Sequence, residues 1–334
     1  MRILSIPSVV LVVSFSIPAF AQTSNEPAVA FVTGTTLTLA SASGQVTQEI
    51  ELGHPVYDFA LSKDQNLLVT VSSDTPNGGN LSLLDLRSHT QTQLTNGHLY
   101  FTRLNEEETE VYADPQFSPD GKSLVFGVHG NENNDGNDAE ENSGPLAVYD
   151  IASHKIQVLK STTNIDGQGE CSEWNPMWSP DGKWILFNCE DGAFITDARG
   201  TTLRDLKLGT DEDAGTSAVS WVGNGCVLYV QSHTDASSLN RERDGIRLFS
   251  LRTSESQIST ALPAFPKESL AGLRESSDEA AIMESSSGVA IKTREKVWTF
   301  PEIERVFDGY HSRRATAAHV IGGWQPSAIP PECK

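Results

Sequence analysis

The chain has 334 residues, with 44 acidic against 24 basic side chains, and its formal net charge is −20. Nucleic acid and anionic membrane surfaces would repel such a chain over the Debye length, so neither is expected as a partner. The length suits one large domain or two smaller ones.

The first residues have the pattern of a cleavable export signal. Arg2 precedes an apolar run over residues 9–20, and Ala21 completes a small-residue exit. Two serines and one proline interrupt the run, which is too short to span a bilayer, so we expect no membrane insertion. We predict a signal peptide over residues 1–21, cleaved after Ala21, and a periplasmic or secreted mature chain.

Two segments share a hairpin pattern, residues 114–126 (DPQFSPDGKSLVF) and residues 175–187 (NPMWSPDGKWILF). Proline presets the backbone angle of a type I turn and glycine accepts the left-handed angle at its end, so each segment predicts a β-hairpin around Ser-Pro-Asp-Gly-Lys. Weaker copies occupy residues 58–70, 217–230 and 270–283. Repeats at this spacing predict an array of small β-sheets.

A second pair of strand-like segments follows each hairpin, as in LAVYDIASHKIQVL from Leu146. Four antiparallel strands per repeat form one propeller blade. Residues 28–50 supply two further strands and residues 314–324 one or two, which would close the ring and remove its open edges. We therefore predict an all-β fold, a β-propeller of six four-stranded blades closed by the N- and C-terminal strands, in a single domain over residues 22–334. Seven blades is the alternative.

The SPDGK hairpin, followed by a strand that ends in aspartate, resembles the WD40-like (PD40) repeat of the TolB family of exported β-propellers. The likeness covers nearly all of residues 22–334. It implies that Asp150 and Asp197, at the ends of third strands, bond turn backbone. The aromatic residues Phe59, Phe117, Trp178 and Trp221 are expected to pack between blades.

The first strand of each blade lines the central channel in propellers of this type, so residues just ahead of the hairpins should ring its mouth. These candidate ligand-binding residues are Tyr57, Asp58, Tyr112, Asp114, Glu173 and Asn175. Their carboxylates could bind a cation, an amine-bearing ligand or a basic peptide. The alternative is that Asp and Asn cap strand ends and turns.

Four cysteines in an exported chain predict two disulfides, for which three connectivities exist. The predicted hairpin register brings Cys171 close to Cys189, so we favour that pair. Cys226 is then left to hold the C-terminal tail at Cys333. Catalytic thiol chemistry is not expected, because the sequence contains no CxxC motif.

Residues 131–144 (NENNDGNDAEENSG) form an acidic insertion that has too few apolar residues to bury anything. Asn131, Asn133 and Asp135 alternate ahead of Gly136, as in a calcium loop, and calcium prefers several oxygen ligands. Asn142 stands where such a loop would have its bidentate glutamate. Calcium is therefore the one cofactor that the sequence suggests, with a solvated loop as the alternative.

The sequence contains no GxSxG elbow, P-loop, dinucleotide fingerprint or HExxH motif. We predict an exported non-enzymatic binding scaffold, TolB-like, for protein or peptide partners, and no oligomeric state follows from the sequence. The alternative is a metal-dependent propeller enzyme of the lactonase, lyase or glycosidase type, with carboxylates at the channel mouth.

Overall fold

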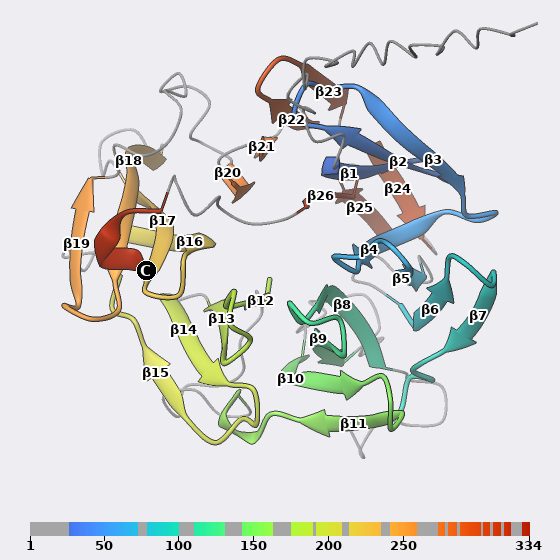
Figure 1. Ribbon diagram of the computed structural model, residues 1–334, viewed down its shortest axis with the longest axis horizontal. Coiled ribbons are helices and arrows are strands. Elements are labelled where there is room, and N and C mark those ends of the chain that lie inside the picture. The colour runs from blue at the N-terminus through green and yellow to red at the C-terminus, as the bar shows by residue number, and fades with distance from the viewer. Residues whose placement is uncertain are drawn as a thin grey trace, which may run out of the picture.

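The computed structural model describes residues 27–72, 79–99, 110–130, 142–162, 175–189, 192–208, 214–234, 241–258, 273–277, 280–285, 288–301, 303–307, 310–314, 317–321 and 329–334. Their strands form six four-stranded antiparallel sheets and one two-stranded ribbon. The sheets are arranged as blades around a centre (Figure 1), so the predicted six-bladed propeller is confirmed.

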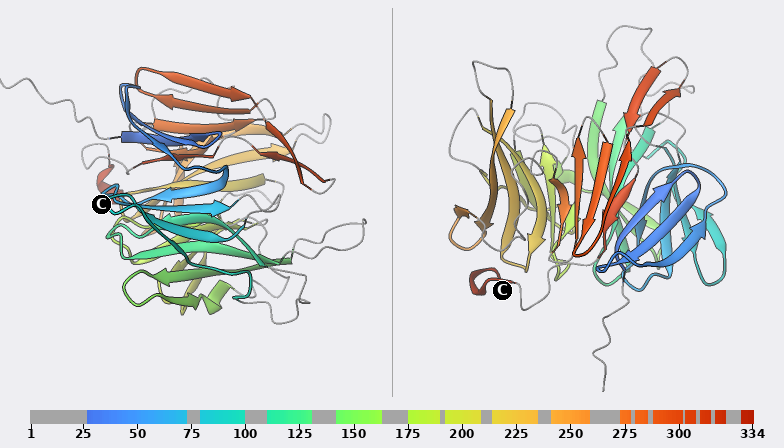
Figure 2. Two further views of the ribbon diagram at one scale, coloured as in Figure 1. Left: turned by 90° about the vertical axis from the view of Figure 1, so that its right-hand side faces the viewer. Right: turned by 90° about the horizontal axis from the view of Figure 1, so that it is seen from above.

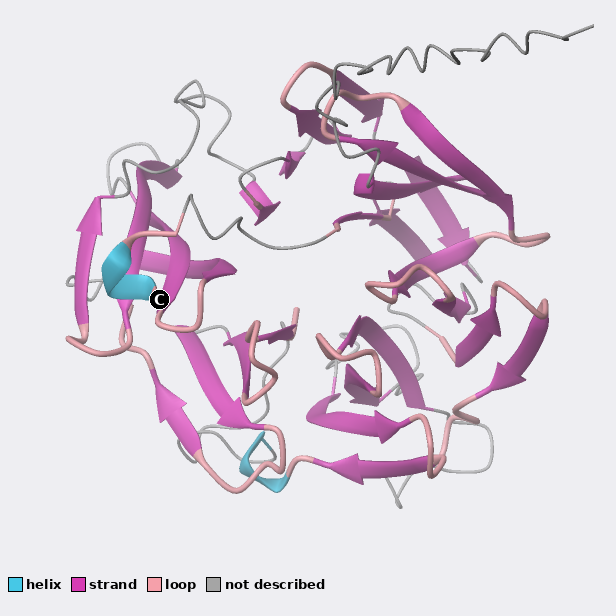
Figure 3. Cartoon of the chain, viewed as in Figure 1, coloured by secondary structure: helices cyan, strands magenta, loops and turns pink. Residues whose placement is uncertain are grey.

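Strands dominate the described part of the chain (Figure 3). Its two helices are single 3-10 turns, η1 (Lys160–Thr162) and η3 (Pro331–Cys333). Within the described ranges, no helix combines the length and the apolar character of a membrane span.

Blades 2 to 6 are each built from four consecutive strands. Blade 2 contains β4 (Val56–Leu61), β5 (Leu67–Ser72), β6 (Leu81–Asp85) and β7 (Thr90–Gln93). Blade 3 contains β8 (Glu110–Phe117), β9 (Ser123–Gly130), β10 (Asn142–Asp150) and β11 (Lys155–Val158). Blade 4 contains β12 (Met177–Trp178), β13 (Trp184–Cys189), β14 (Gly192–Asp197) and β15 (Leu203–Asp205).

The remaining consecutive blades follow the same order. Blade 5 contains β16 (Ala214–Val222), β17 (Cys226–Thr234), β18 (Arg241–Ser250) and β19 (Glu255–Ile258). Blade 6 contains β20 (Leu273–Ser276), β21 (Ala280–Ser285), β22 (Gly288–Thr293) and β23 (Val297–Pro301). The ribbon of β24 (Ile303–Phe307) and β25 (Tyr310–Arg314) comes next in the chain and belongs to no blade.

Blade 1 joins the two ends of the chain. Its strands, from the inside outward, are β26 (Ala318–Val320), β1 (Pro27–Thr33), β2 (Thr36–Ser41) and β3 (Val46–Glu51). The antiparallel pairing of β26 with β1 places His319 opposite Ala30. The segment expected to hold two strands, residues 28–50, holds three, because glycines at φ +63° (Gly34) and +76° (Gly44) allow two tight turns within it.

The hairpin turns follow the predicted chemistry. In blade 3, the Ser118 hydroxyl donates to Asp120 Oδ1 (2.8 Å) and accepts from the Ser123 N–H (3.0 Å). The bond from Ser118 is the main reason that the pKa of Asp120 is lowered. Equivalent bonds link Ser179 to Asp181 and Ser62 to Asp64. One side-chain network therefore holds this turn in three blades, although blade 2 lacks the proline and the glycine.

The second type of turn also uses an aspartate. Asp150 accepts from the Ser153 N–H (2.7 Å), and Asp197 accepts from the N–H groups of Arg199 (2.8 Å) and Thr201 (3.1 Å). These bonds give both residues the turn-holding role that the repeat resemblance implied.

Six buried apolar clusters form the core, and each lies between two neighbouring blades. Phe59 lies between blades 1 and 2, Phe117 between blades 2 and 3, Trp178 between blades 3 and 4, and Trp221 between blades 4 and 5. The Trp221 indole N–H also donates to the carbonyl of Met177 in blade 4 (2.9 Å). Large aromatic side chains therefore act as wedges between sheets, as predicted.

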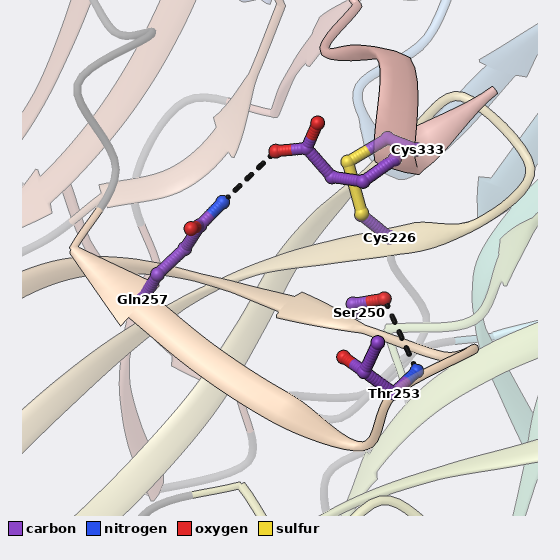
Figure 4. Close-up of a disulfide and its surroundings, with 6 residues drawn as sticks. Cys226, Ser250, Thr253, Gln257 and Cys333 are labelled. Carbon is purple, nitrogen blue, oxygen red and sulfur yellow. Dashed lines mark hydrogen bonds between the residues drawn. A yellow bond between two sulfur atoms is a disulfide. The ribbon is translucent and has the colours of Figure 1, made fainter.

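The C-terminal tail docks on blade 5 through the disulfide Cys226–Cys333, the pair favoured for this tail from the sequence (Figure 4). The Gly225 N–H donates to the Cys333 carbonyl (3.0 Å), and a Cβ on Gly223 would clash with that oxygen. Gly223 and Gly225 therefore allow the tail to pack closely against blade 5. Cys189 is also disulfide-bonded, and Cys171 lies outside the described residues.

The two faces of the ring differ in how their strands are joined. The turns between strands 1 and 2 of blades 2 to 6, and between strands 3 and 4 of every blade, lie on one face, here called the tight-turn face. Connections between strands 2 and 3, and from blade to blade, leave the other face, here called the long-connection face (Figure 2). This division follows from four antiparallel strands per blade.

The hairpin turns allow a matched test of backbone strain. Gly121 has φ +69° and Gln65 has φ +57° at the equivalent position of blade 2. A non-glycine residue is strained in this region by about 1–2 kcal/mol. We expect Gly121→Ala to lower the free energy of unfolding by about 1 kcal/mol and Gln65→Gly to raise it by about 0.5 kcal/mol. Urea unfolding measures both, and shifts of the same sign would contradict the assignment.

The disulfide at the tail closes a sequence separation of 107 residues. Loss of this cross-link in a Cys226→Ala/Cys333→Ala variant should cost roughly 3–5 kcal/mol of unfolding free energy, because the unfolded chain gains freedom. Glu332→Ala is the matched control, since it removes only an exposed hydrogen bond from Gln257 in the same tail. Equal unfolding midpoints for the two variants would contradict a structural role for the disulfide.

Candidate functional site

The first strands of neighbouring blades contact one another and form the inner wall of the ring. Of the predicted channel residues, Asp58 is buried on β4, while Tyr57, Asp114 and Asn175 are half-buried. Tyr112 is fully buried. Glu173 lies outside the described residues. The structure therefore places the described candidates on the inner strands or directly before one, but at different depths.

A carboxylate–histidine–carboxylate cluster connects three blades on this wall. His319 of β26 places Nε2 2.8 Å from Asp58 Oδ1 and Nδ1 2.7 Å from Glu275 Oε1. Asp58 belongs to blade 2 and Glu275 to blade 6, so the bridge spans both neighbours of blade 1. Glu275 also accepts from the Val320 N–H (2.7 Å), which fixes the closing strand.

The two acidic neighbours favour the charged form of the histidine. A neutral imidazole has one N–H, so hydrogen bonds to two ionised carboxylates require the doubly protonated ring. Burial lowers the pKa of His319, but the charges of Glu275 and Asp58 outweigh burial and raise this pKa to about 10. His319 is therefore protonated at neutral pH, with an acidic side chain at each ring nitrogen.

Packing around the cluster keeps it out of water. The side chains of Asp58, Glu275 and His319 are 1%, 8% and 14% exposed. The ring of Phe59 meets the His319 imidazole edge-on, with centroids 4.9 Å apart. Low exposure strengthens the charge interactions within the cluster.

A second link crosses blades 3 and 4. Asp114 Oδ2 accepts from the Asn175 backbone N–H at 3.2 Å. Asp114 and Asn175 occupy equivalent positions of their hairpin repeats, and both have positive φ angles, +50° and +33°. Aspartate and asparagine tolerate this region better than other side chains. Two predicted channel residues are thus brought together, whereas Asp58 is drawn to the closing strand instead.

Tyr112 belongs to a separate buried network. Its hydroxyl donates to Glu110 Oε2 (2.8 Å), which also accepts from the Leu99 N–H (2.5 Å). Burial, together with the charge of Glu110, raises the pKa of Tyr112 above its ordinary value. The Tyr112 hydroxyl therefore holds the start of β8 and is not exposed to a ligand in this structure.

His319 and Glu275 were not among the predicted site residues. His319 stands in the segment predicted to close the ring. Placing that segment innermost in blade 1 would have put His319 on the inner wall, and this was the available signal. Glu275 stands in the faintest hairpin copy, which gave no register. The contact that unites His319 with Asp58 spans 261 positions and had no local signature.

The predicted calcium ligands Asn131, Asn133 and Asp135 lie outside the described residues. Among the residues that are described, no group of His, Cys, Asp and Glu side chains has the arrangement of a metal site.

His319 should give unfolding a distinctive pH dependence. Its pKa rises from about 6.5 in the unfolded chain to about 10 in the folded protein. The cluster's contribution is therefore complete below about pH 6.5, and it falls with rising pH by at most about 1.4 kcal/mol per pH unit until about pH 10.

We expect His319→Gln to remove this slope from urea unfolding measured between pH 6 and pH 10. His54→Gln, at an exposed position, is the control and should follow the unmodified protein. Parallel pH profiles for His319→Gln and the unmodified protein would overturn the charge assignment.

Neither a protein-family model nor a curated protein matches the sequence. Among solved structures, TolB from Acinetobacter baumannii matches with 18% identity and a TM-score of 0.48 over 80% of this chain, which spans only 61% of that TolB. A putative TolB from Agrobacterium tumefaciens matches with 19% identity and a TM-score of 0.41, over 69% of this chain and 80% of that one.

An oligogalacturonate lyase from Vibrio parahaemolyticus matches with 13% identity and a TM-score of 0.51, over 82% of this chain and 74% of the lyase. At such low identity this likeness concerns the fold alone. It agrees with the six sheets of the ring, and the chain is a β-propeller.

Proposed function

We propose that this protein is an exported, non-enzymatic binding scaffold that holds a protein or peptide partner on its long-connection face. The observation that supports this proposal is the engagement of inner-wall carboxylates in bonds between blades. Asp58 and Glu275 bind His319, and Asp114 binds the Asn175 backbone. Groups that hold the ring closed cannot take up a metal or a substrate without loosening it.

The sequence of the connections indicates the chemistry of the partner. Seven segments that leave the long-connection face each contain more acidic than basic residues, and the other connections on that face are balanced or uncharged. The seven are residues 73–80, 94–109, 131–141, 159–176, 190–191, 206–213 and 235–240.

The tight-turn face differs, because hairpin turns on it place a basic side chain next to an acidic one. Lys122 lies 3.5 Å from Asp120, and Lys183 lies 2.8 Å from Asp181. An excess of negative charge on one face attracts positively charged partners and speeds their association. The favoured partner is therefore a basic protein or peptide that approaches the long-connection face.

Export is supported by the covalent chemistry of the chain. The disulfide Cys226–Cys333 is of the kind that persists in oxidising compartments such as the bacterial periplasm. This agrees with the signal peptide proposed for residues 1–21, which lie outside the described residues.

The proposal is tested by purifying the tagged protein from its own envelope extract, with calcium and with chelator, and then measuring the affinity of the recovered partner. We expect a basic partner whose dissociation constant rises several-fold when Glu140→Gln/Glu141→Gln removes two charges from the connection between β9 and β10, and rises further with salt. If the partner is lost in chelator, that result would favour calcium binding by the predicted loop at residues 131–144.

The matched control removes two charges elsewhere. Glu49→Gln/Glu255→Gln changes exposed residues on the outer strands β3 and β19 and should leave the dissociation constant unchanged. Equal weakening by both pairs would mean that net charge alone, and not one face, attracts the partner. Recovery of an acidic partner would contradict the proposal.

The alternative function, a metal-dependent propeller enzyme, is favoured by the half-buried Asp114 on the inner wall. Asp114→Asn separates the two functions, because asparagine keeps an acceptor for the Asn175 N–H and removes the charge. If the protein is a binding scaffold, we expect the affinity of this variant for the basic partner to stay within about twofold of that of the unmodified protein. If Asp114→Asn instead abolishes a metal-dependent activity, the enzyme becomes the favoured function in place of the binding scaffold.

A further inference from the structure

Two buried polar groups at the junction of blades 4 and 5 have no hydrogen-bond partner among the described residues. They are the Tyr229 hydroxyl and the side-chain carbonyl of Gln231, both on β17. Tyr229 is 0% exposed and Gln231 is 1% exposed, so bulk solvent does not satisfy them. The large majority of buried side-chain polar atoms bind either protein or ordered water, so an occupant is expected here.

The two groups face the same way. Residues two positions apart on a strand lie on one face of its sheet. Tyr229 packs with Ala193 and Ile195 of blade 4, so this face of β17 is turned toward blade 4. Both unpartnered atoms therefore belong to residues at the interface of the two blades.

A third polar side chain crosses the same interface from blade 4. Asn188 Nδ2 donates to the Ala218 carbonyl (3.1 Å), and Asn188 Oδ1 accepts from the Ala218 N–H (2.7 Å). Ala218 pairs with Tyr229 in the ladder of β16 and β17, so Asn188 and the two unpartnered groups belong to the same blade junction. That amide retains one further N–H and one further lone pair.

These groups suit a small neutral molecule that both donates and accepts. The Gln231 carbonyl only accepts, the Tyr229 hydroxyl can do either, and the Asn188 amide can do either. A buried water typically makes about three hydrogen bonds to groups of this kind. We propose that the junction of blades 4 and 5 is a binding site for one ordered water molecule, which donates to Gln231 and bonds to the Tyr229 hydroxyl.

The bound water would lie near one face of the ring. Gln231 lies three positions before the end of β17 at Thr234, where a connection leaves the long-connection face. The water therefore satisfies two polar atoms of blade 5 at its interface with blade 4, where the apolar cluster alone would leave them unsatisfied.

Stability measurements test the site. Removing a hydrogen-bonded buried hydroxyl lowers the stability of the fold, whereas removing a buried hydroxyl that has no partner does not. If water binds, Tyr229→Phe and Gln231→Met should each lower the melting temperature. The double variant should lose less than the sum of the two losses, because the water is already displaced by either change. Tyr112→Phe is the matched control, since it removes a buried hydroxyl bonded to Glu110.

Removing an unsatisfied hydroxyl would instead leave the melting temperature unchanged or raise it. That result for Tyr229→Phe, with additive effects in the double variant, would overturn the proposal. A crystal structure of the unmodified protein gives the direct readout. Density within hydrogen-bond distance of both atoms, absent from the double variant, supports the site, and its absence from the unmodified protein refutes it.

Discussion

A ring of blades depends on the join between its last sheet and its first, and here three residues of β26 make that join. Backbone pairing with β1 alone would leave a short strand that frays easily. The imidazolium of His319 adds two charge-assisted hydrogen bonds, one to each neighbouring blade, and the disulfide at Cys333 anchors the following tail on blade 5. Blade 6 is therefore enclosed between two fixed points of the same C-terminal segment.

This closure has a consequence for the chemistry of the inner wall. Carboxylates at a channel mouth could serve catalysis, metal binding or architecture, and residue type does not distinguish these roles. The structure shows an architectural contact for each of them, because Asp58 and Glu275 share the His319 imidazole and Asp114 accepts a backbone N–H from the next blade. These carboxylates therefore contribute to contacts between sheets. Under the proposed function, recognition falls to the connections on the long-connection face, several of which have an excess of acidic residues in their sequence.

Local patterns predicted the fold well because a propeller is built from local hairpins. Ser179, Asp181 and Gly182 encode one turn by their own side chains and backbone angles, and the same network recurs around Ser118 without any distant contact. Closure by the two termini could also be predicted, since leftover strands at both ends complement each other. The three strands of residues 28–50 were undercounted, because two tight glycine turns left no obvious break in the apolar pattern.

The site was harder to predict because its contacts are set by the ring and not by the sequence neighbourhood. Asp58 could be placed on an inner strand from the repeat, but its partner His319 arrives from the far end of the chain. Glu275 could not be placed in the same way, because the hairpin copy at residues 270–283 keeps only Ser277 and Asp278 at its turn and gives no register. Repeats therefore specify which residues face the channel, whereas the departures from the repeat decide which of them meet. In this protein the departures that form the His319 cluster lie in blades 6 and 1, where the ring has to close.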